Sequence, residues 1–435
     1  MSKLQIKGSL ALLSNRNFLK LWLSQAFSQP AGHMLNFVLV LRIFELSGSN
    51  FIVSLLVALV TIPPILFSSM AGVLADSLNR KIIMVISNLL RGIVVLGLIF
   101  FGDSYQAILV LAFIIAFISV FFGPAESASI PTLTKKENLF SANSLFLFTL
   151  YASFLVGYSL AGPSLVWFGE KTYYFLVVLF FMAALMNSLL PSLNYHIKDK
   201  EEIGRNVKKS FKSVFNKLRE GLSYIRHEPL LLITILQIAF VFSVERGVVA
   251  LVPDFALNFL HLNLDQISYF LITPVAIGAL FGALLANKLK NKVSKRKIIT
   301  AGIFVNAITL TLLPVYEFIE RQGIDFGFST NFYWLLIAYV MILAFLSGMA
   351  DVAIIVSAQT MLQEQSHSEK RGRVFGNLSM LMNLIGLPVI LLVGYLATVY
   401  PVGRIITVFG ILTFIVAIIS WVVNKKKLDP MLETQ

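Results

Sequence analysis

The feature that most constrains this chain is a series of apolar stretches, each long enough to cross a lipid bilayer as one helix. A spanning helix needs roughly 20 mostly apolar residues, and 57% of the 435 residues are hydrophobic. Charged residues make up only 13%, about half the share that is usual in soluble domains. These values exclude a soluble enzyme, a nucleic-acid-binding protein and a disordered chain.

Charged residues and turns that contain Gly or Pro divide the apolar sequence into twelve predicted helices. The predicted fold class is therefore an all-α integral membrane protein with twelve transmembrane helices in two six-helix bundles. The predicted spans are 18–44, 50–74, 82–101, 105–127, 140–168, 172–193, 230–257, 267–287, 298–316, 332–358, 374–398 and 402–423.

The basic residues predict which side of the membrane each loop faces. Most of the 35 lysines and arginines lie in one set of loops and at the two ends of the chain. The positive-inside rule assigns these segments, and so both termini, to the cytoplasm. The net charge of +13 then reflects these loops and not a nucleic-acid partner. The exceptions are Arg42, Lys171, Arg321 and Arg404 on the outer side, and Arg91 and Arg246 inside predicted helices.

The longest polar stretch divides the chain near its middle. We expect an N-terminal six-helix bundle in 1–195, a cytoplasmic linker in 196–228 and a C-terminal six-helix bundle in 229–435. Apolar residues in the linker repeat at three- and four-residue spacing, and basic residues fill most of the other face. This pattern predicts an amphipathic helix on the inner membrane surface, with a site for a regulatory partner as the alternative.

Two short motifs recur in both halves of the chain. The segment 72–81, Gly-Val-Leu-Ala-Asp-Ser-Leu-Asn-Arg-Lys, is echoed by 287–296, 215 positions later. The segment 123–130 is echoed by 348–355, 225 positions later. Both pairs lie at equivalent ends of predicted helices. Duplicated halves of this kind build membrane transporters, with the substrate path between the repeats.

These motifs resemble those of the major facilitator superfamily of secondary transporters. The spacing Gly-x-x-x-Asp-x-x-x-Arg-Lys in 72–81 is similar to the superfamily's signature between helices 2 and 3, whereas the second copy has Asn287 and Asn291 in place of Gly and Asp. The segments 123–131 and 371–376 resemble the bacterial exporter branch, which includes macrolide efflux proteins and the enterobactin exporter. The resemblance implies two pseudo-symmetric bundles that work by alternating access in a bacterial inner (cytoplasmic) membrane.

The resemblance also implies a gate on the cytoplasmic side. In the superfamily a charge relay at this place latches the gate, and the alternative here is simple anchoring of the loop by solvated charges. The gate candidates are Gly72, Asp76, Arg80, Lys81, Glu126 and, as the counterpart of Glu126 in the second half, Asp351.

Polar and aromatic side chains inside predicted helices form the candidate substrate path. Offsets of four, eight and eleven residues place four polar residues on one face of the first helix. Polar groups are costly at membrane depth, so this face predicts a water-filled path, and interhelical hydrogen bonding is the alternative. Two tyrosines share a face of the fifth helix and are candidates for an apolar chamber. The candidates are Gln25, Gln29, His33, Asn36, Tyr151, Tyr158 and, in the seventh helix, Gln237.

Glu245 in the seventh helix is the candidate proton carrier. It follows Gln237 by eight residues and so shares its face. The adjacent Arg246 points about 100° away around the helix, so the two side chains do not simply neutralise each other. Carboxyl groups at membrane depth mark proton relays, and a structural ion pair with another helix is the alternative. His33 is the second titratable candidate for proton coupling.

Together these features favour a secondary active transporter, specifically a proton-coupled exporter of amphipathic or lipophilic small molecules. The sequence has no G-x-x-x-x-G-K-[ST] phosphate loop, so an ion gradient is the expected energy source. A flippase for lysophospholipids or lipid-linked molecules is the alternative of the same fold. A non-transporting receptor or assembly factor is the alternative from another class.

The expected partners are a small-molecule substrate, protons or another coupling ion, and the lipid bilayer. We expect a monomer without enzymatic activity and without a nucleic-acid partner. The chain has no cysteine, and its 5 histidines are scattered, so we expect no metal and no cofactor.

Overall fold

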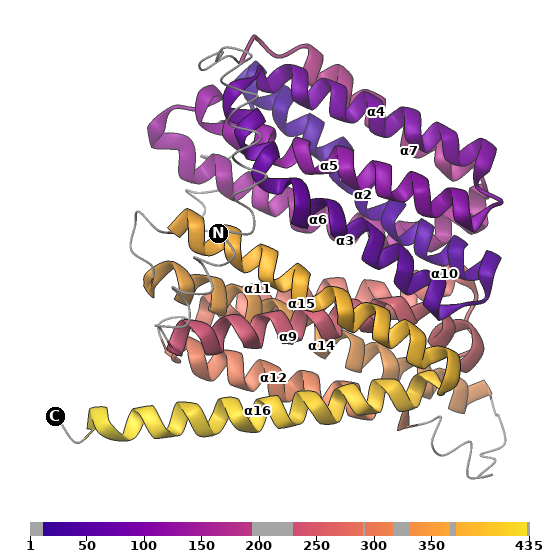
Figure 1. Ribbon diagram of the computed structural model, residues 1–435, viewed down its shortest axis with the longest axis vertical. Coiled ribbons are helices and arrows are strands. Elements are labelled where there is room, and N and C mark those ends of the chain that lie inside the picture. The colour runs from indigo at the N-terminus through magenta and orange to yellow at the C-terminus, as the bar shows by residue number, and fades with distance from the viewer. Residues whose placement is uncertain (1–11, 194–228, 290–291, 316–329, 366–370, 433–435) are drawn as a thin grey trace. The chain divides into compact units, whose positions relative to one another are not determined.

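The structure, a computed structural model, describes residues 12–193, 229–289, 292–315, 330–365 and 371–432. The helices before the middle of the chain are α2 (Arg16–Ser47), α3 (Asn50–Ser77), α4 (Arg80–Phe101), α5 (Tyr105–Leu133), η1 (Lys136–Asn138), α6 (Leu139–Phe168) and α7 (Lys171–Ser188). Those after it are α9 (Pro229–Asp254), η2 (Phe255–Phe259), α10 (Leu264–Ile267), η3 (Ser268–Ile272), α11 (Thr273–Leu289), α12 (Lys295–Leu312), α14 (Thr330–Gln365), α15 (Arg371–Val399) and α16 (Val402–Leu432). Figure 1 labels most of them.

Side chains at the helix ends satisfy backbone groups that the helices leave free. The side chain of Asn15 accepts hydrogen bonds from two backbone N–H groups in the first turn of α2. Gly48 ends this helix with a left-handed φ of 58°. Asn79 and Ser104 cap α4 and α5 in the same way as Asn15 caps α2. These caps explain why the connections between the first helices are short.

The twelve predicted spans coincide with helices, and the predicted fold class is confirmed. Among the described residues, eight helices are long and apolar enough to cross a membrane. The helix ends differ from the prediction. Helix α7 ends at Ser188 and not at 193, because Pro191 follows and the residue before a proline avoids the helical conformation. Helices α14 and α16 continue past their predicted ends into polar sequence, because hydropathy marks the membrane-crossing part and not the whole helix.

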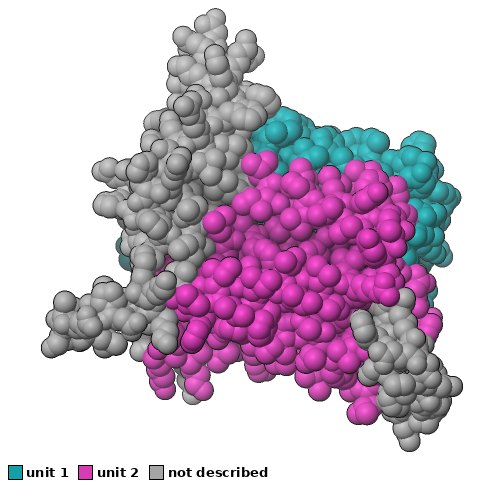
Figure 2. Space-filling model, turned by 60° about the horizontal axis from the view of Figure 1, so that its bottom comes forward, with its two compact units in different colours: residues 1–48, 58–216 teal, residues 49–57, 217–435 magenta. Residues whose placement is uncertain are grey.

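The chain divides into two compact units, which Figure 2 colours separately. Unit 1 comprises residues 1–48 and 58–216, and unit 2 comprises residues 49–57 and 217–435. The first turns of α3 are therefore part of unit 2. The predicted surface helix in the linker 196–228 lies outside the described residues.

Equivalent helices pack together in the two units. In unit 1, α2 packs against α6, and α4 packs against both α5 and α7. In unit 2, α9 packs against α15, and α12 packs against both α14 and α16. The pair α2 and α6 corresponds to α9 and α15 when the long helices of each half are counted from its start. In the same way, the contacts of α4 correspond to those of α12. The internal repeat seen in the sequence is thus a repeat of packing.

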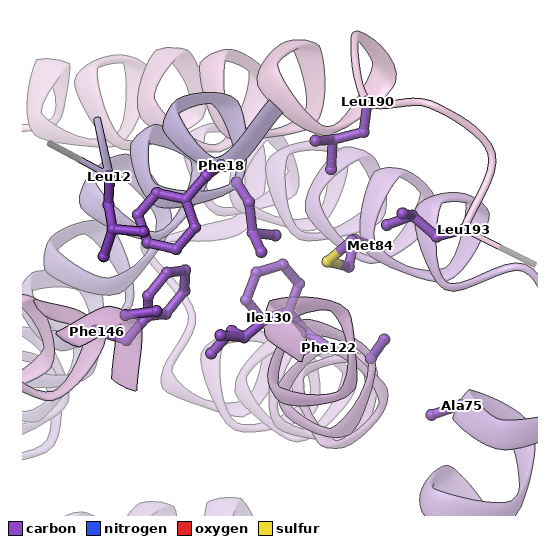
Figure 3. Close-up of a cluster of buried hydrophobic side chains, with 12 residues drawn as sticks. Leu12, Phe18, Ala75, Met84, Phe122, Ile130, Phe146, Leu190 and Leu193 are labelled. Atoms are coloured by element: carbon purple, nitrogen blue, oxygen red, sulfur yellow. The ribbon is translucent and has the colours of Figure 1, made fainter. Parts of the chain in front are cut away.

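A cluster of buried apolar side chains closes the end of unit 1 at which α2 and α4 begin and α5 ends (Figure 3). The Phe18 and Phe146 rings meet edge to face, with centroids 5.8 Å apart, and so join α2 to α6. Met84 from α4 and Ile130 from α5 complete the centre of the cluster. Burial of these side chains fixes the helices on which the polar residues described below stand.

Three glycines let α11 and α14 approach backbone to backbone. A Cβ atom added to Gly278 or Gly282 of α11 would collide with the backbone of α14, and one added to Gly348 of α14 would collide with the backbone of α11. Small residues allow such close approach between membrane helices. This contact fixes the position of α14, which also carries Asp351.

Candidate substrate path and coupling site

The polar face of α2 changes in burial along the helix. Gln25 is 4% exposed, and its Nε2 donates a hydrogen bond to the carbonyl oxygen of Phe146 in α6 at 3.3 Å. Gln29 and His33 are partly buried, and Asn36 is exposed. Gln25 therefore forms a hydrogen bond between α2 and α6. Interhelical hydrogen bonding is the alternative to a role in the substrate path that the sequence left open. Asn36 is instead exposed at the surface of α2. Water could form hydrogen bonds with its amide, whereas lipid hydrocarbon could not.

His33 belongs to a group of four rings between α2 and α6, which we call the ring cluster. Its ring centroid lies 5.5 Å from that of Phe154 and 5.7 Å from that of Tyr158. The Phe154 and Tyr158 centroids are 4.5 Å apart, and Phe37 lies 5.6 Å from Tyr158. Gly157 permits this approach, since a Cβ there would lie 2.7 Å from the Cβ of His33. The His33 Nε2 is buried and has no hydrogen-bond partner among the described residues.

The other predicted path residues lie outside the ring cluster. Tyr151 is two turns before Tyr158 on α6 and is 40% exposed. Gln237 is partly buried on α9, two turns before Glu245. Of the predicted path residues, the structure thus brings the rings of His33 and Tyr158 together.

Glu245 and Asp351 of unit 2 stand on α9 and α14, which pack against each other. Glu245 stands on α9, where the adjacent Arg246 acts on it. Asp351 stands on α14, and its Oδ1 accepts a hydrogen bond of 2.6 Å from Nδ2 of Asn306 in α12. The Oγ of Ser347 donates to Oδ1 of Asn306 at 3.3 Å. Asn306 therefore joins Asp351 of α14 to α12.

Arg91 and Glu126 are buried in unit 1, with exposures of 7% and 6%. The Nε of Arg91 donates to Oγ of Ser119 at 3.0 Å, and its Nη1 donates to Oδ1 of Asn88 at 3.2 Å. The guanidinium carbon lies 4.7 Å from the centre of the Phe122 ring, a cation–π contact. The charge of Arg91 acts on Glu126, whose Oε1 is buried with no hydrogen-bond partner among the described residues.

Comparison with known proteins decides the family. The sequence profile of the Major Facilitator Superfamily matches residues 21–338. The chain belongs to this superfamily. It is accordingly a multi-pass membrane transporter and not an enzyme, and the resemblance seen in the sequence motifs is confirmed.

Its relatives include exporters and share the fold of solved transporters. Macrolide efflux protein A of Streptococcus pyogenes is 25% identical over 429 residues, which cover 95% of this chain and 97% of that protein. The uncharacterized MFS-type transporter YfiS of Bacillus subtilis is 27% identical over 229 residues, which span only about half of each protein, 52% and 51%. The crystal structure of an auto-inhibited POT family peptide transporter matches with a TM-score of 0.71 over 94% of this chain and 97% of that chain. At 13% identity this last likeness concerns the fold alone.

The superfamily signature lies between α3 and α4. Arg80 is buried, and its Nη1 donates to the carbonyl oxygen of Ala128 in α5 at 2.7 Å, while its Nε donates to that of Ala75 at 3.1 Å. The carboxylate of Asp76 lies 4.0 Å from Arg80 and is 75% exposed. Arg80 therefore ties the end of α3 to α5, and Asp76 keeps most of its surface open.

The remaining gate candidates have few contacts. The backbone N–H of Lys81 donates to the side chain of Asn79, which caps α4. A Cβ added to Gly72 would meet nothing within 4 Å. Glu126 is buried in α5 of unit 1, and Asp351 belongs to α14 of unit 2.

Sequence analysis missed two features of the polar sites. Asn306 and Ser347 were not predicted, although the repeat offset of 215 places Asn306 at the position equivalent to Arg91.

Arg42 lies within 4 Å of three carboxylates, because the chain brings the loops after α4 and α6 to the end of α2. These are Glu45 at 3.0 Å, Asp103 at 2.8 Å and Glu170 at 3.8 Å. Within the described residues, no group of three or more His, Cys, Asp or Glu side chains is placed to hold a metal ion.

Proposed function

We propose that this transporter is a proton-coupled exporter of amphipathic or lipophilic small molecules in the bacterial inner membrane. It moves its substrate by alternating access of two bundles, residues 1–195 and 229–435. It works as a monomer with both termini in the cytoplasm. Similarity over nearly the full length to macrolide efflux protein A of Streptococcus pyogenes supports export as the direction.

The ring cluster is the observation that carries the proposal. The rings of Phe154 and Tyr158 offer apolar faces, and His33 adds a buried ring nitrogen without a hydrogen-bond partner among the described residues. Asn36, three residues beyond His33, adds an exposed amide. Small-molecule sites combine such aromatic walls with a few polar groups that fix orientation. A molecule with a broad apolar surface and a few hydroxyl groups fits this chemistry.

Other predicted residues extend the path and its gate. Gln29 lies one turn before His33 on the same face of α2, and Tyr151 precedes Tyr158 by two turns on α6. Gln237 extends the path on α9. The signature loop forms the gate on the cytoplasmic side, with Gly72, Asp76, Arg80 and Lys81 as its residues.

Glu245 is the main candidate for carrying the coupling proton, and His33 is the second. Carboxyl groups at membrane depth are rare and mark proton relays. Glu245 is partly buried on α9, next to Arg246 in the sequence. Uptake of a proton on the outer side and its release on the inner side would then drive the substrate outward.

The test measures transport of radiolabelled erythromycin, a macrolide, by the purified full chain in proteoliposomes, with and without an imposed pH gradient. We expect gradient-driven accumulation by the wild type. Tyr158→Ala should raise the half-saturating concentration roughly fivefold, because loss of one aromatic contact costs on the order of 1 kcal/mol.

Tyr174→Ala is the matched control, because Tyr174 is 53% exposed on α7, outside the ring cluster. It should leave the half-saturating concentration unchanged. Equal effects of the two variants would remove the ring cluster from the substrate path. Absence of erythromycin transport, combined with movement of a fluorescent lysophospholipid in a parallel assay, would favour a flippase instead.

A further inference from the structure

Helix α3 belongs to both compact units. Its residues 50–57 are part of unit 2, and its residues 58–77 are part of unit 1, so Figure 2 colours the two parts of this helix differently. Each of the other helices in the part of the chain that the structure describes lies within one unit. A relative movement of the two units would therefore act directly on α3.

The first two turns of α3 are held by α9 and α15 of unit 2. Nδ2 of Asn50 donates a hydrogen bond to the carboxylate of Asp254, whose other oxygen accepts one from Asn258 at 2.6 Å. Ser54, one turn later, lies against Gly394 of α15, because a Cβ added to that glycine would collide with the serine side chain. Asn50 and Ser54 are both buried, with exposures of 5% and 0%.

The inner part of α3 is held by unit 1. The Phe67 ring meets that of Phe117 in α5 edge to face, with centroids 4.9 Å apart, and Phe121 lies 5.3 Å from Phe117. Ala75 belongs to the cluster of buried apolar side chains in unit 1, and its carbonyl oxygen accepts a hydrogen bond from Arg80. This part of the helix is thus fixed to α4 and α5.

Two consecutive prolines lie between these two anchored parts. Pro63 and Pro64 have no backbone N–H, so the carbonyl groups of Leu59 and Val60 lack their usual hydrogen bonds within the helix. Helices bend most readily where such bonds are missing. The weakened turn begins just after residue 58, at which the helix passes from unit 2 to unit 1.

We propose that α3 is a jointed helix. Its outer turns stay docked on unit 2, its inner part moves with unit 1, and Pro63 and Pro64 form the joint. The joint serves the proposed alternating access and rests on it, since that mechanism requires the two units to move relative to each other. A stiff helix would have to break its contacts with one unit at each movement, whereas a jointed helix keeps both sets of contacts.

Release of the outer turns from unit 2 is the other way in which α3 could follow the movement. The hydrogen bond from Asn50 to a carboxylate and the close fit of Ser54 against Gly394 favour docking. On release, Oδ1 of Asn50 and Oγ of Ser54 would gain water, since both are buried without a hydrogen-bond partner among the described residues. The two ways differ in which distances within the molecule change.

Distances between pairs of spin labels test the joint without any substrate. The chain has no cysteine, so pairs of introduced cysteines are the only labelling sites. Ile52→Cys marks the outer turns of α3, Phe101→Cys marks α4 of unit 1, and Tyr400→Cys follows α15 of unit 2. In the full chain in lipid nanodiscs, we expect one narrow distance for labels 52 and 400. For labels 52 and 101 we expect a broad or two-peaked distribution.

Labels at Leu66→Cys and Phe101→Cys are the matched control, because Leu66 is 38% exposed just beyond the prolines, and they should give one narrow distance. A distribution for labels 52 and 101 as narrow as this control would overturn the joint, because α3 would then be stiff. A broad distribution for labels 52 and 400 would overturn the docking of the outer turns.

Replacement of both prolines adds a test of their role. Pro63→Ala with Pro64→Ala restores the two backbone N–H groups, and we expect it to narrow the distribution for labels 52 and 101. Pro388→Ala is the control, since Pro388 lies inside α15, which belongs wholly to unit 2, and it should leave that distribution unchanged. An unchanged distribution in the double variant would remove the prolines from the joint. If the double variant does not fold, the three label pairs decide alone, and a failed erythromycin assay leaves all of these measurements intact.

Discussion

The contact between α4 and α5 in unit 1 and the contact between α12 and α14 in unit 2 occupy equivalent places but use different side chains. In unit 1 a buried arginine lies against an aromatic ring and beside a buried carboxyl group. In unit 2 an amide and a hydroxyl lead to a carboxyl group that is only partly buried. The packing of the helices is repeated, whereas the polar side chains at the contact are not. The two halves of such a repeat can therefore share one architecture and still divide the chemistry between them.

The largest effect is expected when Arg91 of unit 1 is replaced by asparagine, the residue at the equivalent position 306 of unit 2. Arg91→Asn removes a buried guanidinium that donates hydrogen bonds to Ser119 and Asn88. A hydrogen bond to a charged group contributes about 1.5–3 kcal/mol, so loss of the two should lower the free energy of unfolding by about 3–6 kcal/mol. Denaturant titration in detergent micelles measures this loss. If Arg91→Asn is as stable as the wild type, the hydrogen bonds of the buried guanidinium do not stabilise unit 1.

A smaller effect is expected from removing the hydrogen bonds in unit 2. Asn306→Ala deletes the donor to Asp351 and the acceptor for Ser347, and a hydrogen bond to a charged group contributes about 1.5–3 kcal/mol. The same denaturant titration should show a loss in this range. The control is Ile308→Ala, because Ile308 is 49% exposed on the same helix and should matter little. A loss as large as that of Arg91→Asn would erase the difference between the units.

The smallest effect is expected at Arg42, although this residue has three ion-pair partners. Its partners Glu45, Asp103 and Glu170 are 47%, 86% and 64% exposed, and exposed pairs contribute about 0–1 kcal/mol each. Arg42→Gln should thus lower the free energy of unfolding by less than Arg91→Asn does. The remaining difference should shrink when salt is added, because ions screen exposed charges. A salt-independent loss as large as that at Arg91 would show that burial is not the deciding factor.

Hydropathy and loop charge were sufficient to predict the helices, because membrane-crossing segments must satisfy their backbone within one helix. They did not predict helix ends, as α7 and α14 show, because polar turns continue some helices and proline shortens others. The face shared by His33 and its neighbours followed from helical periodicity. The meeting of His33 with Tyr158, and of Asn306 with Asp351, depends on contacts between helices, which periodicity within one helix does not report. The repeat offset of 215 does relate Arg91 to Asn306. Only the structure shows that the helices carrying them pack against equivalent partners in the two units.

The buried guanidinium of Arg91 has an electrical consequence. A unit charge that crosses a membrane potential of 100 mV changes in energy by about 2.3 kcal/mol. The hydrogen bond from Arg91 in α4 to Ser119 in α5 ties this charge to two helices. The membrane potential therefore acts on α4 and α5 together, and a tilt of one helix without the other would break this bond.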